Sequence, residues 1–214
     1  MDRGVEAKTQ SMPGCFIALE GLDGSGTTSC ARALTERLQA RGHVVVTTAQ
    51  PSDRSIGRAI RGFLREGNER LDPRALALLF AADRLDHLAG VIEPALAAGS
   101  VVICDRYVAS SWAYQALSCD LAWVKTINAH ARWPDLTAVL TVEPELAAQR
   151  VQARAQTTAA PREIFDALAL QRRVAAGYAA LVSEGRDDVV SIDASAPLAS
   201  VIAALEQACV TRGL

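Results

Sequence analysis

The sequence has few aromatic side chains, which make up 5% of its 214 residues. Surfaces that stack the bases of single-stranded nucleic acid are made of such side chains, so the composition argues against one. The formal net charge of −2 gives no support for bulk nucleic-acid binding either. We therefore expect no nucleic-acid partner. Any anionic ligand must be bound by a local group of residues, and not by the overall charge of the protein.

Long apolar runs are also absent. No apolar segment reaches the roughly 18 residues typical of a membrane span, and the N-terminus lacks the apolar region of a signal peptide. The five cysteines are scattered, odd in number, and lack the spacing of metal ligands. We interpret them as reduced thiols, and expect a cytoplasmic protein with no membrane partner.

Apolar segments and helical patterns alternate along the chain, as in an α/β domain with a parallel sheet. Strands are expected at 16–20, 44–46, 101–104, 136–142 and 189–192. Helices are expected at 28–41, from the turn at 50–58 to about 66, and at 72–98, 110–117, 120–131, 145–154, 164–182 and 197–210, with a break near Glu93-Pro94 as an alternative for the longest. The pattern predicts one domain over residues 15–214, with a five-stranded parallel sheet. Residues 1–14 are expected to be a flexible N-terminal extension.

A glycine-rich turn follows the first predicted strand and leads into a helix. The order strand, turn, helix places backbone N–H groups where they can hold polyphosphate. The template is G-x-x-x-x-G-K-[ST], and Thr27 stands in the lysine position. The expected nucleotide-binding residues are Gly21, Leu22, Asp23, Gly24, Ser25, Gly26, Thr27 and Thr28. The loop is complete except for one positive charge.

Asp105 and Arg106 follow the predicted strand at 101–104. Ligands of open parallel sheets bind outside the carboxyl ends of the strands, where the glycine-rich turn also lies. The planar fork of Arg106 can grip a phosphate, with an ion pair to Asp105 as the alternative interpretation. Asp105 and the Thr28 hydroxyl are the expected ligands of Mg²⁺.

Several segments, in order along the chain, closely resemble the thymidylate kinase family. They are Glu20-Gly21-Leu22-Asp23-Gly24, Leu79-Phe80-Ala81-Ala82-Asp83-Arg84, the run from Asp105 to Gln115, and Trp133-Pro134-Asp135-Leu136-Thr137. The resemblance implies a P-loop kinase fold with a short lid at about 154–163. It also implies transfer of the γ-phosphoryl group of ATP to dTMP with Mg²⁺, and a homodimer.

The resemblance also implies roles for an acceptor pocket. Phe80 stacks on thymine and Arg84 binds a base carbonyl, and their spacing places both on one helix face. Asp23 reaches the acceptor sugar and the metal shell, and Arg106 binds the acceptor phosphate. The remaining expected contacts are Ser111 at the pyrimidine N3 edge, Tyr114 against the 2′ carbon, and Gln115 as a further polar contact.

The chain departs from the family pattern at two places. The usual Glu-Pro-Gly turn appears as Gln50-Pro51-Ser52-Asp53 without the preceding arginine, so Arg54 or Arg58 is expected to serve the acceptor phosphate. For the missing loop lysine, the lid residues Arg154 and Arg162 are expected to supply the catalytic charge, whereas Arg150 is assigned to a solvated helix face.

Two other interpretations remain open from the sequence. A non-catalytic nucleotide-binding homologue would explain Thr27, although the retained set of charged residues argues against it. A kinase for another pyrimidine deoxynucleotide would have the same loop and a different acceptor.

Overall fold

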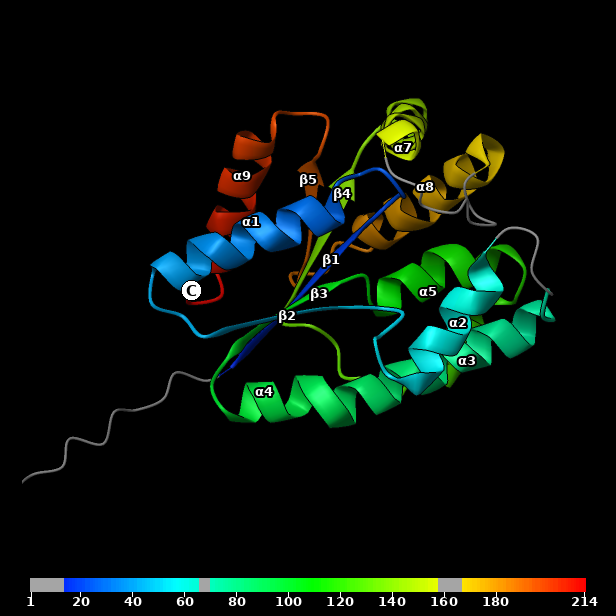
Figure 1. Cartoon of the computed structure of the whole chain (residues 1–214), viewed down its shortest axis with the longest axis horizontal. Coiled ribbons are helices and arrows are strands. Elements are labelled where there is room, and N and C mark those ends of the chain that lie inside the picture. Colours follow the sequence, from blue (N-terminus) through cyan, green and yellow to red (C-terminus); the bar gives the residue numbers. More distant parts are fainter. Residues whose placement is uncertain (1–13, 66–69, 158–166) are drawn as a thin grey trace, which may run out of the picture.

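The computed structural model describes residues 14–65, 70–157 and 167–214. Within them, five parallel strands form one sheet in the order β2-β3-β1-β4-β5 (Figure 1). The strands are β1 (Cys15–Gly21), β2 (Val45–Ala49), β3 (Val101–Asp105), β4 (Leu136–Thr141) and β5 (Val189–Asp193). The sequence prediction of a five-stranded parallel sheet flanked by helices is confirmed.

Helices connect the strands. The α-helices are α1 (Thr27–Ala40), α2 (Ser55–Leu64), α3 (Pro73–His87), α4 (Glu93–Ala97), α5 (Val108–Tyr114), α6 (Leu121–Ile127), α7 (Pro144–Thr157), α8 (Leu168–Ser183) and α9 (Leu198–Val210). A π-helical turn, η1 (Leu88–Ile92), joins α3 to α4, and a 3₁₀ turn, η2 (Gln115–Leu117), follows α5. No helix in the described parts of the chain is long and apolar enough to span a membrane.

Both faces of the sheet are covered. Ile17 and Leu19 of β1 pack with α1 and α9 on one face, whereas Phe16 and Ala18 pack with η1 and α4 on the other. Successive side chains of a strand point to opposite faces, so a strand buried on both sides is apolar throughout. This accounts for the continuous apolar run that predicted β1.

The start of the helix expected at 72–98 is confirmed, because Asp72 caps it by accepting from the Arg74 N–H at 2.8 Å. This helix passes through η1 into α4, which begins at Glu93, beside the alternative break. Two other predicted helix ends were wrong. Helix α7 continues to Thr157, three residues beyond the prediction. Exposed alanine and glutamine favour a helix without any apolar periodicity. Helix α6 ends at Ile127 rather than at 131.

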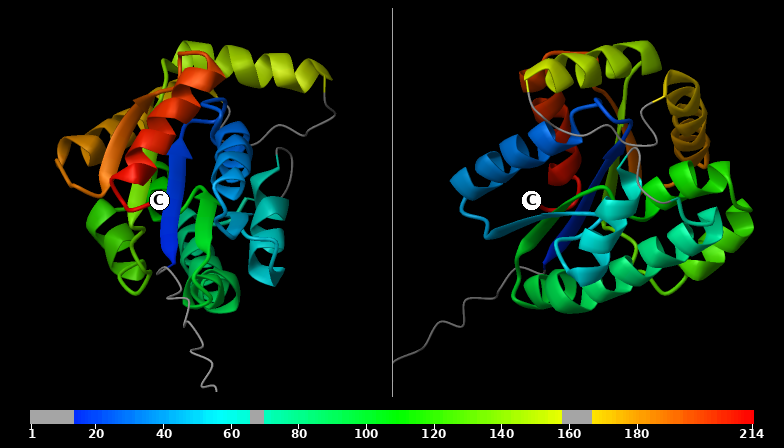
Figure 2. Two further views of the ribbon diagram at one scale, coloured as in Figure 1. Left: turned by 90° about the vertical axis from the view of Figure 1, so that its left-hand side faces the viewer. Right: turned by 45° about the vertical axis from the view of Figure 1, so that its right-hand side comes forward.

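The carboxyl ends of the strands meet at one edge of the sheet. Leu19 of β1 pairs with Asp105 of β3, which in turn pairs with Ala49 of β2. Helix α7 lies across this edge, at the end towards which β1 points (Figure 2). The loop that follows β1 lies against this helix at Gly24. Of the expected extension and lid, residues 1–13 and 158–163 lie outside the described residues.

Candidate active site

The loop after β1 has the geometry of an anion-binding turn. Gly24 and Gly26 have φ angles of 89° and 96°, which favour glycine. The Ser25 N–H donates to the Leu22 carbonyl at 3.0 Å, and α1 begins at Thr27 directly after the turn. The free N–H groups of a helix's first turn attract phosphate. This end of α1 therefore faces the expected nucleotide.

Helix α7 packs directly against this loop. A Cβ atom at Gly24 would lie 2.2 Å from the Ala147 carbonyl oxygen and 3.1 Å from a Val151 methyl group. Only glycine allows so close an approach. Arg154 lies seven residues after Ala147, which is two helical turns further along the same face. It is exposed, in the last turn of α7.

The Thr28 hydroxyl donates to Asp105 Oδ2 at 2.5 Å. The other carboxylate oxygen, Oδ1, is buried and has no hydrogen-bond partner among the described residues. Hydroxyl and carboxylate oxygens beside a phosphate loop suit Mg²⁺, which prefers oxygen ligands and keeps several waters. The side chains present therefore fit the metal expected at this position.

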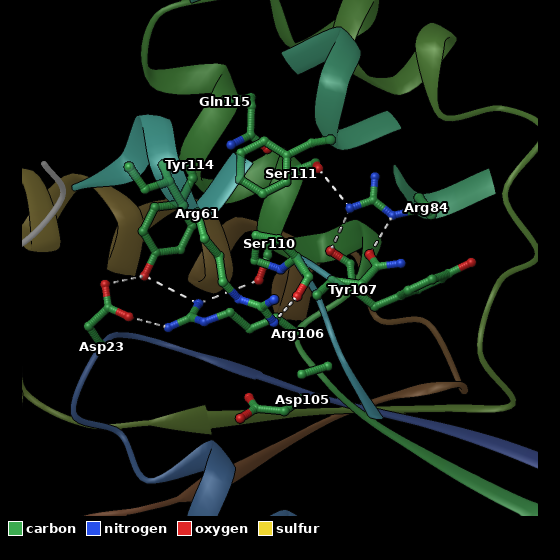
Figure 3. A pocket seen from close by; sticks show the side chains of 15 residues that line it. Asp23, Arg61, Arg84, Asp105, Arg106, Tyr107, Ser110, Ser111, Tyr114 and Gln115 are labelled. Carbon is green, nitrogen blue, oxygen red and sulfur yellow. Dashed lines mark hydrogen bonds and ion pairs between the residues drawn. The ribbon is translucent and has the colours of Figure 1, made fainter. Parts of the chain in front are cut away.

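Arg106 and Asp23 form an ion pair at the strand edge. Arg106 Nη2 lies 2.6 Å from Asp23 Oδ1, and Nη1 donates to the Gly21 carbonyl at 2.9 Å. The Tyr114 hydroxyl lies 3.3 Å from both Asp23 Oδ2 and Arg106 Nη1. Figure 3 shows Asp23, Arg106 and Tyr114 joined on one side of the cavity. Arg106 thus reaches the phosphate loop, and does not pair with its neighbour Asp105 in the way that the alternative interpretation required.

Glu20 holds the turn that carries Arg106. Its buried carboxylate accepts from the Tyr107 N–H at 2.9 Å, from the Ser110 hydroxyl at 2.5 Å and from the Tyr178 hydroxyl at 3.0 Å. Burial raises the pKa of Glu20. Arg106 has a φ of 67°, which is uncommon outside glycine and is found at functional sites. The sequence analysis missed Glu20 as a functional residue, although a carboxylate inside a buried strand is a signal in itself.

A cavity of about 220 Å³ opens beside Arg106. Its lining includes most of the acceptor residues expected from the sequence: Asp23, Phe80, Arg84, Arg106, Ser111, Tyr114 and Gln115. The same lining includes Asp105, which faces the phosphate loop. The structure therefore brings the acceptor residues and the expected metal ligand into one space.

Arg84 lies at the opposite end of this cavity from Asp23 (Figure 3). It is 1% exposed and donates to Ser111 Oγ at 2.9 Å and to the Tyr107 carbonyl at 3.1 Å. It also donates to the side chains of Gln50 and Asn128. Burial lowers the pKa of Arg84. Gln115 Oε1 is buried and has no partner among the described residues.

Arg61 supplies the second guanidinium that borders the acceptor space near Arg106. It donates to the Pro51 carbonyl at 2.5 Å and to the Ser52 carbonyl at 2.9 Å. The expectation that Arg54 or Arg58 would serve the cavity was wrong. Arg54 forms a two-bond ion pair with Asp86, and Arg58 donates to Asp53 and Ser55. Neither belongs to the cavity lining.

Arg154 and Arg162 were expected to supply the missing loop charge, and Arg150 was expected on a solvated helix face. Arg150 donates to the Ala194 carbonyl at 2.9 Å, so it joins α7 to the loop after β5 and is not simply a solvated residue as expected. Arg154 lies on the face of α7 that contacts the loop, and Arg162 lies outside the described residues. Thr27 itself is 6% exposed.

A parallel α/β sheet, a phosphate loop and a polar cavity at the strand ends define a nucleotide-binding phosphotransferase. The comparisons with known proteins agree. The model of the family described as thymidylate kinase matches residues 19–204. A thymidylate kinase of Halalkalibacterium halodurans is 38% identical over 196 residues, covering 89% of this chain and 93% of the relative.

Two further relatives cover most of the chain. A thymidylate kinase of Cereibacter sphaeroides is 39% identical over 190 residues, with 85% of this chain and 88% of the relative covered. A probable thymidylate kinase of Pyrococcus horikoshii is 41% identical over 172 residues, with 78% of this chain and 82% of the relative covered. The chain belongs to the thymidylate kinase family.

Proposed function

We propose that this chain is an ATP-dependent dTMP kinase, which transfers the γ-phosphoryl group of ATP to a phosphate oxygen of dTMP and releases dTDP and ADP. The observation that carries the proposal is a cavity at the strand ends that holds the expected acceptor residues beside Asp105. It has Arg106 and Arg61 near the phosphate loop and Arg84 at the far end. A nucleoside monophosphate bound with its phosphate towards Arg106 places the acceptor oxygen next to the loop.

The two ends of the cavity differ in what they can bind. Guanidinium groups recognise phosphate through two parallel hydrogen bonds. Arg106 is held by Asp23 at 2.6 Å, so an arriving phosphate competes with that carboxylate for Arg106. Asp23 then becomes available to the acceptor sugar. Tyr114 packs against both residues and narrows the space beside the ribose 2′ position, which favours a deoxynucleotide.

Arg84 and Gln115 favour thymine over cytosine. The bonds to protein acceptors leave one N–H on Arg84 Nη1, and Gln115 offers a buried carbonyl oxygen without a partner among the described residues. A donor and an acceptor match the C4 carbonyl and N3–H of thymine. Phe80, Leu64 and Pro51 give the cavity an apolar wall for the ring and its methyl group.

ATP and Mg²⁺ are the proposed co-substrate and cofactor. The N–H groups from Gly21 to Thr28 would bind the β-phosphate, and Thr28 and Asp105 would hold the metal. When bound, Mg²⁺ would neutralise charge on the transferring phosphate oxygens. Asp105 Oδ1 supports this assignment, because a buried carboxylate oxygen without a partner is costly unless a cation or water satisfies it.

We further propose that Arg154, with Arg162, provides the charge that Thr27 lacks. Arg154 is favoured by its place on the same face of α7 as Ala147 and Val151, the residues against Gly24. A lid over about 154–163 would carry both arginines towards the γ-phosphate and would exclude water. A non-catalytic homologue is less well supported, because it would have no use for a metal carboxylate at Asp105.

A substrate panel tests the proposed function. Purified protein with ATP and Mg²⁺ is offered dTMP, dUMP or dCMP, and the diphosphate product is measured. We expect dTDP to form with the highest kcat/KM. Faster turnover of dCMP or dUMP would reassign the substrate. Binding of dTMP without any diphosphate product would favour the non-catalytic alternative.

We propose a homodimer that forms through α3. The exposed residues Ala75, Leu78, Ala82 and Leu85 of α3 and Ala89 of η1 repeat every three or four residues, which makes an apolar stripe along one face. Leu78 and Leu85 are 50% and 42% exposed. Exposed leucines one heptad apart are typical of a helix that packs against a partner.

Replacing Leu78 and Leu85 by glutamate together should convert the protein from twice the chain mass to the monomer mass in light scattering. Four charges would then face one another across the two-fold axis. Leu198→Glu is the matched control, because Leu198 is equally exposed but lies on α9. A wild-type monomer, or a double variant that remains dimeric, would contradict this assembly.

The cytoplasm is the proposed location. All five cysteines are free, and four of them are buried. Burial raises the pKa of Cys15 and Cys30 to about 11, so these thiols are unreactive at neutral pH. Persistent free thiols are typical of a reducing compartment.

A further inference from the structure

We propose that Gln50 and His87 are positioning residues for Arg84, and that together they form a hydrogen-bond relay which holds its guanidinium towards the base end of the cavity. The relay starts at Thr48 in β2, passes through His87 in α3, and reaches Arg84 through the Gln50 side chain. The inference rests on the proposed function, since it concerns how the acceptor base is bound. Neither Gln50 nor His87 was expected from the sequence to act at the site.

Among the residues that the structure describes, Arg84 donates its hydrogen bonds to neutral acceptors. Its Nε donates to Gln50 Oε1 at 3.1 Å, Nη1 donates to Asn128 Oδ1, and Nη2 donates to Ser111 and to the Tyr107 carbonyl. None of these partners carries a charge. A buried cation whose hydrogen bonds go to neutral dipoles depends on the orientation of each acceptor, because the carboxylates of Glu20 and Asp83 act on its charge only through space.

The orientation of the Gln50 amide is fixed from both sides. Arg84 can only donate, so the Gln50 oxygen must face it and the Gln50 NH₂ group must face His87. Gln50 Nε2 lies 3.2 Å from His87 Nδ1, which therefore accepts. The proton of His87 is then on Nε2, and that N–H donates to Thr48 Oγ1 at 2.7 Å. One tautomer of His87 satisfies all three contacts.

The Asn128 amide is fixed in the same way. Its Nδ2 donates to the Val124 carbonyl at 2.8 Å, which leaves Oδ1 towards Arg84. Asn128 closes α6, so this contact also ties the end of that helix to the cavity. Gln50 differs from Asn128 because its second partner, His87, is titratable.

The neutral form of His87 prevails at neutral pH. Burial lowers the pKa of His87. The charged groups around it are Asp53, Asp83 and Asp86, which favour the protonated form, and Arg54 and Arg84, which oppose it. Asp83 is itself held by the Ser52 N–H and hydroxyl. The net effect keeps Nδ1 available as an acceptor.

Protonation of His87 would reverse the relay. An N–H at Nδ1 would face the Gln50 NH₂ group, and rotation of the amide to accept it would turn that NH₂ group towards Arg84 Nε. In either orientation of the amide, two donors would face each other, at the contact of Gln50 with His87 or at its contact with Arg84. Because the pKa of His87 is lower in the folded state than in the unfolded chain, its stabilising contribution is complete above pH 6.5. That contribution is lost as the pH falls below this value.

Three variants test the relay: Gln50→Leu, His87→Leu and His87→Asn. The two leucine variants remove hydrogen bonds that hold a buried charge, so we expect KM and Kd for dTMP to rise about ten- to a hundredfold. We expect kcat to change less than threefold, and discrimination against dCMP to weaken. Asparagine keeps an oxygen near the Nδ1 position, so His87→Asn should recover most of the affinity lost in His87→Leu. His130→Leu is the control, because His130 is exposed and does not line the cavity.

The pH profile separates positioning from a merely structural role. Wild-type kcat/KM for dTMP should decline on the acid side with an ionisation that is absent from His87→Asn. Unchanged dTMP affinity in Gln50→Leu, or the same acid limb in wild type and His87→Asn, would overturn the relay. If His87→Leu does not fold, Gln50→Leu and His87→Asn still decide the question. A wild-type protein that makes no dTDP would instead overturn the proposed function.

Discussion

Replacing Arg106 by alanine is expected to lower kcat/KM for dTMP by about a thousandfold, which corresponds to about 4 kcal/mol of transition-state stabilisation. Arg106 bonds both the phosphate loop at Gly21 and the acceptor side at Asp23. Its removal takes away the phosphate contact. It also leaves the Asp23 carboxylate without its ion-pair partner, so that this carboxylate repels the acceptor phosphate. Steady-state kinetics with dTMP at saturating ATP and Mg²⁺ would measure the loss.

Two companion variants identify the cause of that loss. Arg106→Gly relieves the φ of 67° and should be at least as stable as Arg106→Ala, yet it should be equally inactive. Arg58→Ala removes an exposed arginine from outside the cavity lining and should stay within twofold of wild type. Activity within tenfold of wild type in either Arg106 variant would exclude the proposed phosphate contact.

The second large effect is expected at the lid. Replacing Arg154 and Arg162 together by alanine should lower kcat by two to three orders of magnitude, about the range for arginines that stabilise phosphoryl transfer. KM for dTMP should change little, because neither arginine is expected to bind the acceptor. The single variants would then tell which residue provides most of the charge.

A matched arginine controls for loss of surface charge near the lid. Arg172 lies on α8, where it forms an exposed ion pair with Glu145 of α7. Arg172→Ala should leave kcat within twofold, since exposed ion pairs contribute little. If the Arg154/Arg162 double variant kept more than about a third of wild-type kcat, the loop charge would have to come from another residue.

The sheet was predictable because parallel strands buried on both faces are short apolar runs, and those runs are easy to see between helical patterns. The first residue of the second predicted strand shows the limit of that signal. Val44 is apolar but 70% exposed, and β2 begins one residue later. Apolar composition identifies a strand. The residues at which the strand begins and ends depend instead on which of them pair with the neighbouring strand.

The acceptor residues were predictable through family resemblance, but their partners were not. Arg106 was weighed against an ion pair with Asp105, its neighbour in sequence. Asp105 ends β3 and bonds Thr28, whereas the left-handed backbone at Arg106 turns that side chain towards Asp23. Adjacent residues at a strand end point in different directions, so sequence adjacency is a poor guide to pairing there.

Arg61 and His87 were missed because their importance arises only from tertiary contacts. Arg61 follows Ile60, part of the buried face of α2, and its place beside the cavity depends on how α2 packs on the turn at 51–53. His87 is one of the last residues of α3, and a lone histidine on a buried face is usually a satisfied core residue. Its relation to Arg84 appears only when the Gln50 amide is placed between them.

We propose that the phosphate loop works without its lysine because an arginine from α7 and the lid supplies the charge. Thr27→Lys tests this most directly, with kcat for dTDP formation measured beside wild type. If the arginines already fill that role, a lysine at the buried Thr27 position adds a second cation to the same space. We expect a kcat no higher than that of wild type, and an increase of threefold or more would contradict the replacement of the lysine by an arginine.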